Sequence, residues 1–172
     1  MKEVIIMEKI SVIKGDISYL PLHVDALVNA ANSALVPGGG VDGALNQKAG
    51  PDLGRAMLKF GGTPTGTAVY TEAYKLNADY VIHAVGPHYL DGDHGEQELL
   101  IEAYKAIMTI ATELEVNSLA LPFLSTGVYG YPVEEAIKVA IDTVKEFDLD
   151  AKIYFVAFDA TTEKLTEKYL NQ

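Results

Sequence analysis

Short runs rich in β-branched and aromatic residues alternate with stretches of helical periodicity along this chain of 172 residues. Strands are expected at residues 10–14, 26–29, 68–71, 80–85, 118–121 and 153–158. The last four are mostly apolar, which is typical of strands whose sheet is covered on both faces. Apolar residues recur at helical spacing over 99–114 and 133–147, with Pro132 suited to a first helical position, and shorter helices are expected at 53–60 and 162–170. This alternation predicts an α/β fold in which helices cover both faces of a sheet.

The composition favours one folded domain and excludes several kinds of site. The hydrophobic fraction is 49%, so a chain of this length can bury a full core, and we expect a single domain over residues 1–172. The formal net charge of −11 argues against an extended electrostatic contact with nucleic acid. The absence of cysteine excludes disulfides, thiolate metal sites and a cysteine nucleophile.

The expected location is the cytoplasm. Near the N-terminus the apolar run at residues 4–7 ends before Glu8 and is too short for the hydrophobic part of a signal peptide. No stretch approaches the ~20 apolar residues of a membrane span. We therefore expect a soluble protein without a membrane partner.

Two glycine-rich segments indicate an anionic ligand. Residues 38–43 read Gly-Gly-Gly-Val-Asp-Gly and residues 125–130 read Ser-Thr-Gly-Val-Tyr-Gly, and each follows an expected strand. Glycine lets backbone N–H groups approach an anion closely, and a following helix adds its positive end. Because ligands of α/β sheets bind beyond the carboxyl ends of the strands, we expect both segments to contact one phosphate-bearing ligand. Asp42 stands inside the first segment, where an anion would repel it, which makes this carboxylate a candidate for chemistry.

Several other residues have both a structural and a functional interpretation. Asn29 and Asn32 follow an apolar run, where asparagine either forms a turn or presents its amide to sugar hydroxyls. Asp16, after the first strand, is either a turn residue or an acceptor for a base or ribose. Phe158 is predicted to lie in the core, with stacking on a planar base as the alternative, and His83 is predicted to be a core histidine with satisfied hydrogen bonds.

Residues 88–96 contain several potential metal ligands in the sequence His-Tyr-Leu-Asp-Gly-Asp-His-Gly-Glu. They lack the regular spacing of a metal site, and Asp91, Asp93 and Glu96 suit the start of the next helix, where the helix dipole favours anions. We therefore expect no metal and no cofactor.

Five segments together resemble the macro domain family, in its MacroD-type branch. They are residues 15–17, 28–32, 38–43, 82–87 and 125–132, and they stand in the order and spacing of that family, with the resemblance covering about residues 10–170. The resemblance implies a three-layer α/β/α sandwich on a mixed, mainly parallel sheet that binds ADP-ribose along its top. Pro37 stands where many relatives carry another glycine, and the absence of cysteine argues against the zinc-dependent branch.

The resemblance also implies roles for individual residues. Asp16 matches the residue that bonds the adenine amino group, the Ile17 backbone lies beside it, and Phe158 falls where an aromatic ring flanks adenine. Asn32 matches the amide on the distal ribose and Asp42 the carboxylate needed for hydrolysis, so these two are the catalytic candidates. The diphosphate is expected between the two glycine-rich segments. The ADP-ribose-binding candidates are thus Asp16, Ile17, Asn32, Gly40, Val41, Ser125, Thr126, Gly127, Val128, Tyr129 and Phe158.

The activity implied by the resemblance is hydrolysis. The enzyme would remove mono-ADP-ribose from acidic side chains of proteins and deacetylate O-acetyl-ADP-ribose, acting as a monomer on ADP-ribosylated proteins or on the acetylated nucleotide. Ordinary glycosidases use two carboxylates, whereas Asp42 is the one carboxylate of this segment, so a substrate diphosphate is a candidate to hold the attacking water. The alternative is a module that binds ADP-ribose without turnover, and the presence of both Asn32 and Asp42 favours the enzyme. The proton acceptor and the substrate linkage (acidic side chain, O-acetyl ester or nucleic-acid phosphate end) stay open.

Overall fold

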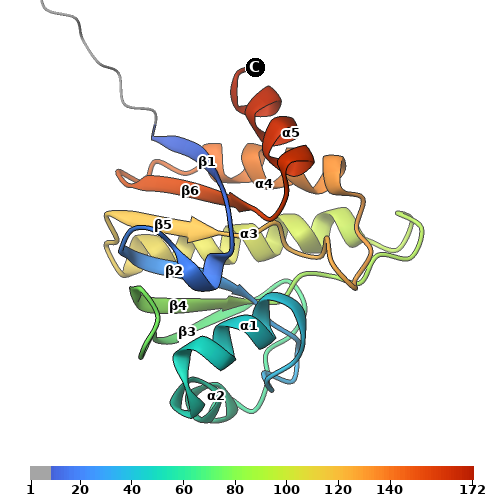
Figure 1. The fold of residues 1–172 in the computed structure, drawn as a ribbon. Coiled ribbons are helices and arrows are strands. Elements are labelled where there is room, and N and C mark those ends of the chain that lie inside the picture. The colour runs from blue at the N-terminus through green and yellow to red at the C-terminus, as the bar shows by residue number, and fades with distance from the viewer. Residues whose placement is uncertain (1–8) are drawn as a thin grey trace, which may run out of the picture.

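A six-stranded sheet forms the centre of the molecule (Figure 1), in the order β1-β6-β5-β2-β4-β3. The computed structural model describes residues 9–172, so the apolar run at residues 4–7 lies outside the described part. Neighbouring strands are parallel except for β3 and β4, which confirms the expected mixed, mainly parallel sheet. The strands are Ile10–Lys14 (β1), Val24–Ala30 (β2), Ala68–Glu72 (β3), Ala78–Ala84 (β4), Ser118–Leu121 (β5) and Lys152–Ala157 (β6).

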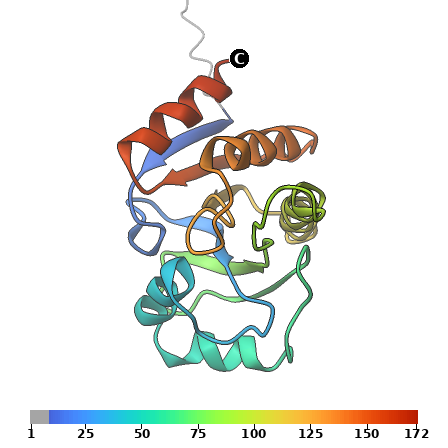
Figure 2. The same cartoon turned by 90° about the vertical axis from the view of Figure 1, so that its right-hand side faces the viewer.

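Helices lie on both sides of this sheet (Figure 2), as the alternation of elements predicts. One apolar layer is formed with α3, α4 and α5, and its largest fully buried side chains include Tyr104 and Phe155. The other is formed with α1, α2 and the short 3-10 helix η1, and it includes Leu27 and Met57. The three-layer α/β/α sandwich is therefore confirmed. The helices are Ile17–Tyr19 (η1), Gly40–Ala49 (α1), Pro51–Leu58 (α2), Glu96–Glu113 (α3), Val133–Lys145 (α4) and Ala160–Leu170 (α5).

Helix α1 is the main departure from the sequence-based expectation. The sequence favours a helical stretch after residues 38–43, whereas α1 begins within that segment, at Gly-Val-Asp-Gly, where glycine is a poor helix former and gives no helical signal. Asp42 consequently lies in the first turn of α1 and not in a loop. At α4, Pro132 is the N-cap, one residue before its predicted place, which is within the usual uncertainty of a helix boundary.

The parallel strands place the ends of β1, β2, β4, β5 and β6 at one edge of the sheet. The segments that leave these ends supply the walls of a cleft, as expected for an open α/β sheet. Within residues 9–172, no helix is both long and apolar enough to cross a membrane.

Candidate functional site

A cleft of about 660 Å³ opens beyond the carboxyl ends of the parallel strands, and its volume suits a small-molecule ligand. Asn29 does not line it, so of the two amides near the end of β2 only that of Asn32 reaches the cleft. Segments far apart in the sequence thus converge on one site. Every residue that the resemblance assigns to binding or catalysis lines this cleft: Asp16, Ile17, Asn32, Gly40, Val41, Asp42, Ser125, Thr126, Gly127, Val128, Tyr129 and Phe158.

The loop at residues 125–130 joins β5 to the start of α4. Ser125 adopts a left-handed backbone conformation (φ 69°), and its carbonyl accepts a hydrogen bond from the N–H of Tyr131 at 2.8 Å. The N–H of Gly130 donates to the carbonyl of Gly127 at 3.0 Å, which tightens the loop. Within the described residues, the N–H groups of 126–129 donate to no backbone carbonyl. Unused N–H groups ahead of a helix start form a suitable site for an anion.

The hydroxyl of Ser125 is also unused. It is buried and has no hydrogen-bond partner among residues 9–172. It packs against Gly86, where a Cβ atom would collide with Ser125 Oγ. Gly86 therefore allows a serine hydroxyl to lie in the cleft wall, where a ligand is the natural partner for it. Sequence reasoning did not identify Gly86, although it stands in the segment 82–87.

Asp42 is 3% exposed, and three N–H donors hold its carboxylate. Oδ1 accepts from Asn29 Nδ2 at 2.7 Å and from Asn46 Nδ2 at 2.9 Å, and Oδ2 accepts from the N–H of Gly38 at 2.7 Å. Burial raises the pKa of Asp42, while the hydrogen bonds from Asn29, Gly38 and Asn46 oppose that rise. The carboxylate is thus fixed in the wall of the cleft, and its ionisation depends on these donors.

The amide of Asn32 is half-buried and bound to the backbone of Val36. Nδ2 donates to the carbonyl of Val36 at 2.8 Å, and Oδ1 accepts from its N–H at 3.2 Å. The turn-forming interpretation of Asn32 is therefore correct. An amide nitrogen carries two hydrogens and the oxygen two lone pairs, so both atoms retain capacity for a ligand.

Asp16, Ile17 and Phe158 follow the neighbouring strands β1 and β6. Asp16 Oδ1 accepts from the N–H of Ser18 at 2.9 Å and from its hydroxyl at 2.6 Å, which caps η1 and leaves Oδ2 without a partner among the described residues. The prediction that Phe158 lies in the core is wrong, since its side chain is 84% exposed. The reason is that β6 ends at Ala157, one residue earlier. An exposed ring in a cleft wall is available to stack on a planar base.

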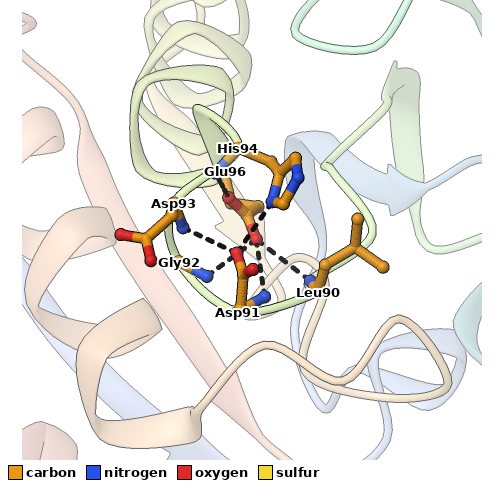
Figure 3. A network of polar contacts seen from close by, with 6 residues as sticks. All are labelled: Leu90, Asp91, Gly92, Asp93, His94 and Glu96. Atoms are coloured by element: carbon orange, nitrogen blue, oxygen red, sulfur yellow. Dashed lines mark hydrogen bonds and ion pairs between the residues drawn. The ribbon is translucent and has the colours of Figure 1, made fainter.

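Glu96 organises the loop at residues 88–95 (Figure 3). This first residue of α3 is 2% exposed, and its Oε2 accepts from the N–H groups of Leu90 at 3.0 Å, Asp91 at 3.1 Å and Gly92 at 2.9 Å. Its Oε1 accepts from the N–H of His94 at 2.6 Å. These bonds, that from Gly92 above all, lower the pKa of Glu96 to about 2. The carboxylate serves the preceding loop, which sequence reasoning did not foresee.

The same loop carries a cluster of potential metal ligands. Ligand atoms of Asp91, His94 and Glu96 lie within 4.8 Å of one another. The oxygens of Glu96 already accept four N–H groups, and Nδ1 of His94 is paired with Asp91 Oδ1 at 2.8 Å. The hydrogen bonds account for the arrangement without an ion.

His83 is completely buried and hydrogen-bonded, as predicted for a core histidine. Its Nε2 lies 2.9 Å from Thr71 Oγ1 and its Nδ1 lies 3.1 Å from Asn29 Nδ2. Burial lowers the pKa of His83 to about 4, so the ring is neutral at pH 7. Asn29 thus lies beneath the cleft between His83 and Asp42, a supporting position that neither interpretation of its sequence context anticipated.

Comparison with known proteins gives a consistent result. A family model described as Macro domain matches residues 28–140. The O-acetyl-ADP-ribose deacetylase of Salmonella gallinarum is 46% identical over 172 residues, which cover 95% of this chain and 95% of that protein. A macro domain-containing protein of Chlorobaculum tepidum is 48% identical over 153 residues, covering 87% of this chain and 88% of the relative.

Solved structures agree with the sequence comparison. The Oceanobacillus iheyensis macrodomain with ADP superposes with a TM-score of 0.84 at 32% identity, covering 93% of this chain and 88% of that one. The Trypanosoma brucei macrodomain in complex with ADP-ribose superposes with a TM-score of 0.85 at 34% identity, covering 94% of this chain and 69% of that one.

Proposed function

The chain belongs to the macro domain family, and on this premise we propose that it is a hydrolase that binds ADP-ribose in the cleft and deacetylates O-acetyl-ADP-ribose. Relatives with that name and 46% identity over nearly the whole chain support the activity. We also propose that the same site removes mono-ADP-ribose from acidic side chains of proteins. In this proposal residues 1–172 form a single macro domain, with its core at about 10–170, that acts as a monomer in the cytoplasm.

The ligand is proposed to run along the cleft in one direction. The adenine would lie by Asp16, Ile17 and Phe158, where a carboxylate oxygen without a partner and an exposed ring are available. The diphosphate would lie between the first turn of α1 and the loop at 125–130, whose N–H groups supply a positive potential that the net charge of the chain does not. The distal ribose would then reach Asn32 and Asp42.

The single observation that favours a hydrolase over a binding module is the placement of Asp42. A buried carboxylate in the wall of a site suited to an anion costs free energy that its three donors offset in part, and such a charge is typical of a functional group. In the deacetylation, a water oxygen bonds to the ester carbonyl carbon, the bond to the ribose oxygen breaks, and one water proton passes to that ribose oxygen; ADP-ribose leaves together with acetic acid, which ionises to acetate. Asp42 either orients the distal ribose or takes part in the proton transfer, a role typically worth ~10²–10⁴-fold in rate.

A turnover assay tests this proposal directly. Wild-type protein is incubated with O-acetyl-ADP-ribose and with Glu-linked, Ser-linked and Arg-linked ADP-ribosyl peptides, and acetate or ADP-ribose release is followed. We expect turnover of the ester and of the Glu-linked peptide, and loss of both in Asp42→Ala. Tight binding of ADP-ribose with no turnover of any substrate would instead identify a binding module.

A further inference from the structure

A chain of buried polar contacts runs from the edge of the sheet to Asp42. Thr71 on β3, His83 on β4 and Asn29 on β2 lie on the face of the sheet that α1 and α2 cover. Asn29 and His83 are register partners in the parallel pair of β2 and β4, and all three residues are less than 9% exposed. The contacts link Thr71 Oγ1 to His83, His83 to Asn29, and Asn29 to Asp42. Burying four polar side chains in an apolar layer costs free energy unless they are hydrogen-bonded, so the chain of contacts needs a structural or functional explanation.

The hydrogen-bond pattern fixes the tautomer of His83. Thr71 Oγ1 lies 2.9 Å from the carbonyl oxygen of Glu72 and donates its one hydrogen there. It must therefore accept from His83, which places the ring proton on Nε2 and a lone pair on Nδ1. The low pKa of His83, about 4 because of its burial, agrees with a neutral ring. Besides Asp42, no charged side chain of the described residues bonds to Asn29 or His83, and the carboxylate of Glu72 is exposed.

The tautomer in turn fixes the amide of Asn29. Its Nδ2 atom faces two acceptors, Asp42 Oδ1 at 2.7 Å and His83 Nδ1 at 3.1 Å, and its two hydrogens serve both. A flipped amide would turn Oδ1 toward two other acceptors, the Asp42 carboxylate and the lone pair of His83 Nδ1, and would be repelled by both. Asn29 Oδ1 accepts no hydrogen bond from residues 9–172, so only the two bonds donated by Nδ2 stabilise this orientation of the amide. If the ring proton moved to Nδ1, it would face a hydrogen of Asn29 Nδ2, and the amide could no longer bond to His83 and Asp42 together.

We propose that Thr71 and His83 are positioning residues for the proposed hydrolysis: they lock the amide of Asn29 in the orientation that holds the carboxylate of Asp42 in the cleft. The kinetic consequence of this role depends on the proposed function, whereas the hydrogen-bond chain itself does not. Neither residue lines the cleft, so neither acts on substrate directly. A purely structural role would make the two residues matter for stability alone.

Thr71→Val is the decisive variant, because valine keeps the shape of the side chain and removes the acceptor for His83 Nε2–H. We expect kcat for O-acetyl-ADP-ribose to fall about tenfold, with KM changed less than about threefold, the scale of one hydrogen bond to a charged group. The acid limb of the kcat profile should move upward by about one pH unit. Thr143→Val, a buried threonine of α4 outside the cleft, is the matched control and should leave kcat and the profile unchanged.

Two substitutions of His83 separate positioning from packing. His83→Phe removes the acceptor for Asn29, and kcat should fall further than in Thr71→Val. His83→Asn can place an amide oxygen near the position of Nδ1, so it should recover most of the lost kcat. If His83→Phe does not fold, Thr71→Val and His83→Asn still decide the question.

NMR provides a readout that does not depend on turnover. In the wild-type protein the ¹⁵N signals of His83 should report a proton on Nε2, and the ¹³C titration of the Asp42 carboxyl should move to higher pH in Thr71→Val but not in Thr143→Val. Wild-type protein that turns over none of the substrates would defeat the proposed function and leave this test valid. A proton on Nδ1 in the wild type, or an Asp42 titration that Thr71→Val leaves unchanged, would overturn the positioning role.

Discussion

His88 and Tyr129 are stacked, with ring centroids 3.7 Å apart and ring planes at 29°. This contact joins the loop after β4 to the loop after β5, and the N–H of Tyr89 adds a hydrogen bond of 2.8 Å to the carbonyl of Tyr129. Glu96 holds the first of these loops through four N–H groups. Tyr129 lines the cleft and Glu96 does not, so the position of a cleft wall depends on a carboxylate outside it.

The first prediction concerns this dependence and pH. The pKa of Glu96 in the folded protein is about 2, below its usual 4.5, so the unfolded chain binds the proton more readily. The stabilisation is therefore fully present above about pH 4.5 and is lost as the pH falls through 2. Glu96→Gln should lower Tm at pH 7, and the difference from wild type should shrink toward pH 2. Thermal unfolding between pH 2.5 and 7 measures this, with the exposed Glu98→Gln as control; a difference independent of pH would contradict it.

The second prediction separates the role of Asp42 in turnover from any role in ligand binding. Asp42→Ala should lower turnover at least ~100-fold, the lower scale for a positioned acid–base group, while ADP-ribose affinity stays within about tenfold. The variant removes the acceptor of the buried Asn29 amide and of the Asn46 and Gly38 donors, so Tm should fall as well. Turnover and affinity are therefore measured below the lower Tm. Asp148→Ala, an exposed carboxylate outside the cleft, is the control, and near-wild-type turnover in Asp42→Ala would remove Asp42 from the mechanism.

The third prediction tests recognition of the nucleobase by Asp16. If its free Oδ2 accepts from the adenine amino group, Asp16→Ala should weaken ADP-ribose binding by ~1.5–3 kcal/mol, the scale for a charged partner. Inosine diphosphate ribose lacks that amino group, so the same substitution should weaken its binding much less. Calorimetric titration of both ligands measures the difference.

Asp16→Asn separates recognition from capping. The asparagine keeps an oxygen for the hydrogen bonds to Ser18 that cap η1, and it offers a donor in place of Oδ2. It should bind ADP-ribose less tightly than wild type and lose less affinity for the inosine ligand, whose base carries an oxygen at that position. Equal losses for both ligands in both variants would make Asp16 a turn residue only.

Local sequence patterns predicted the strands of the sheet and the long helices, because apolar periodicity is a short-range signal. A helical stretch was expected after residues 38–43, but the start of helix α1 within that segment was not, since its glycine-rich first turn lacks that signal and its stability comes from tertiary contacts such as those of Leu45. Phe158 was predicted to lie in the core because the last strand was expected to include it. The strand ends at Ala157, so Phe158 lies beyond it and is exposed.

Apart from Phe158, the cleft residues were identified from five short segments, whereas the supporting roles of residues outside the cleft were not. Asn29, Asn46 and Glu96 act through hydrogen bonds to side chains and loops whose positions depend on the assembled sheet. No spacing in the sequence indicates that Asn29 lies under Asp42 and Asn32 beside the cleft. Asn29 lies within β2, in register with His83 of β4, whereas Asn32 follows the end of the strand at Ala30.

The last prediction tests whether the loop at 125–130 holds the diphosphate, and Gly127 allows a matched pair of variants. A Cβ atom at Gly127 would meet nothing within 4 Å, and Gly127 is not among the glycines with positive φ, so Gly127→Ala should fold normally. Gly127→Glu should also unfold cooperatively, because Gly127 is exposed on the rim. Its carboxylate would, however, repel the diphosphate and occupy ligand volume.

At a ligand concentration of about 100 Kd, binding adds roughly 2.7 kcal/mol to stability, which corresponds to a rise in Tm of about 5–10 °C for a chain of this size. We expect ADP-ribose to produce this rise in wild type, a smaller or equal rise in Gly127→Ala, and none in Gly127→Glu, while ribose and adenine alone produce none. Differential scanning fluorimetry at matched concentrations measures all three proteins. An equal rise in wild type and Gly127→Glu would place the ligand elsewhere, because a carboxylate at the point where the loop meets a diphosphate is incompatible with binding there.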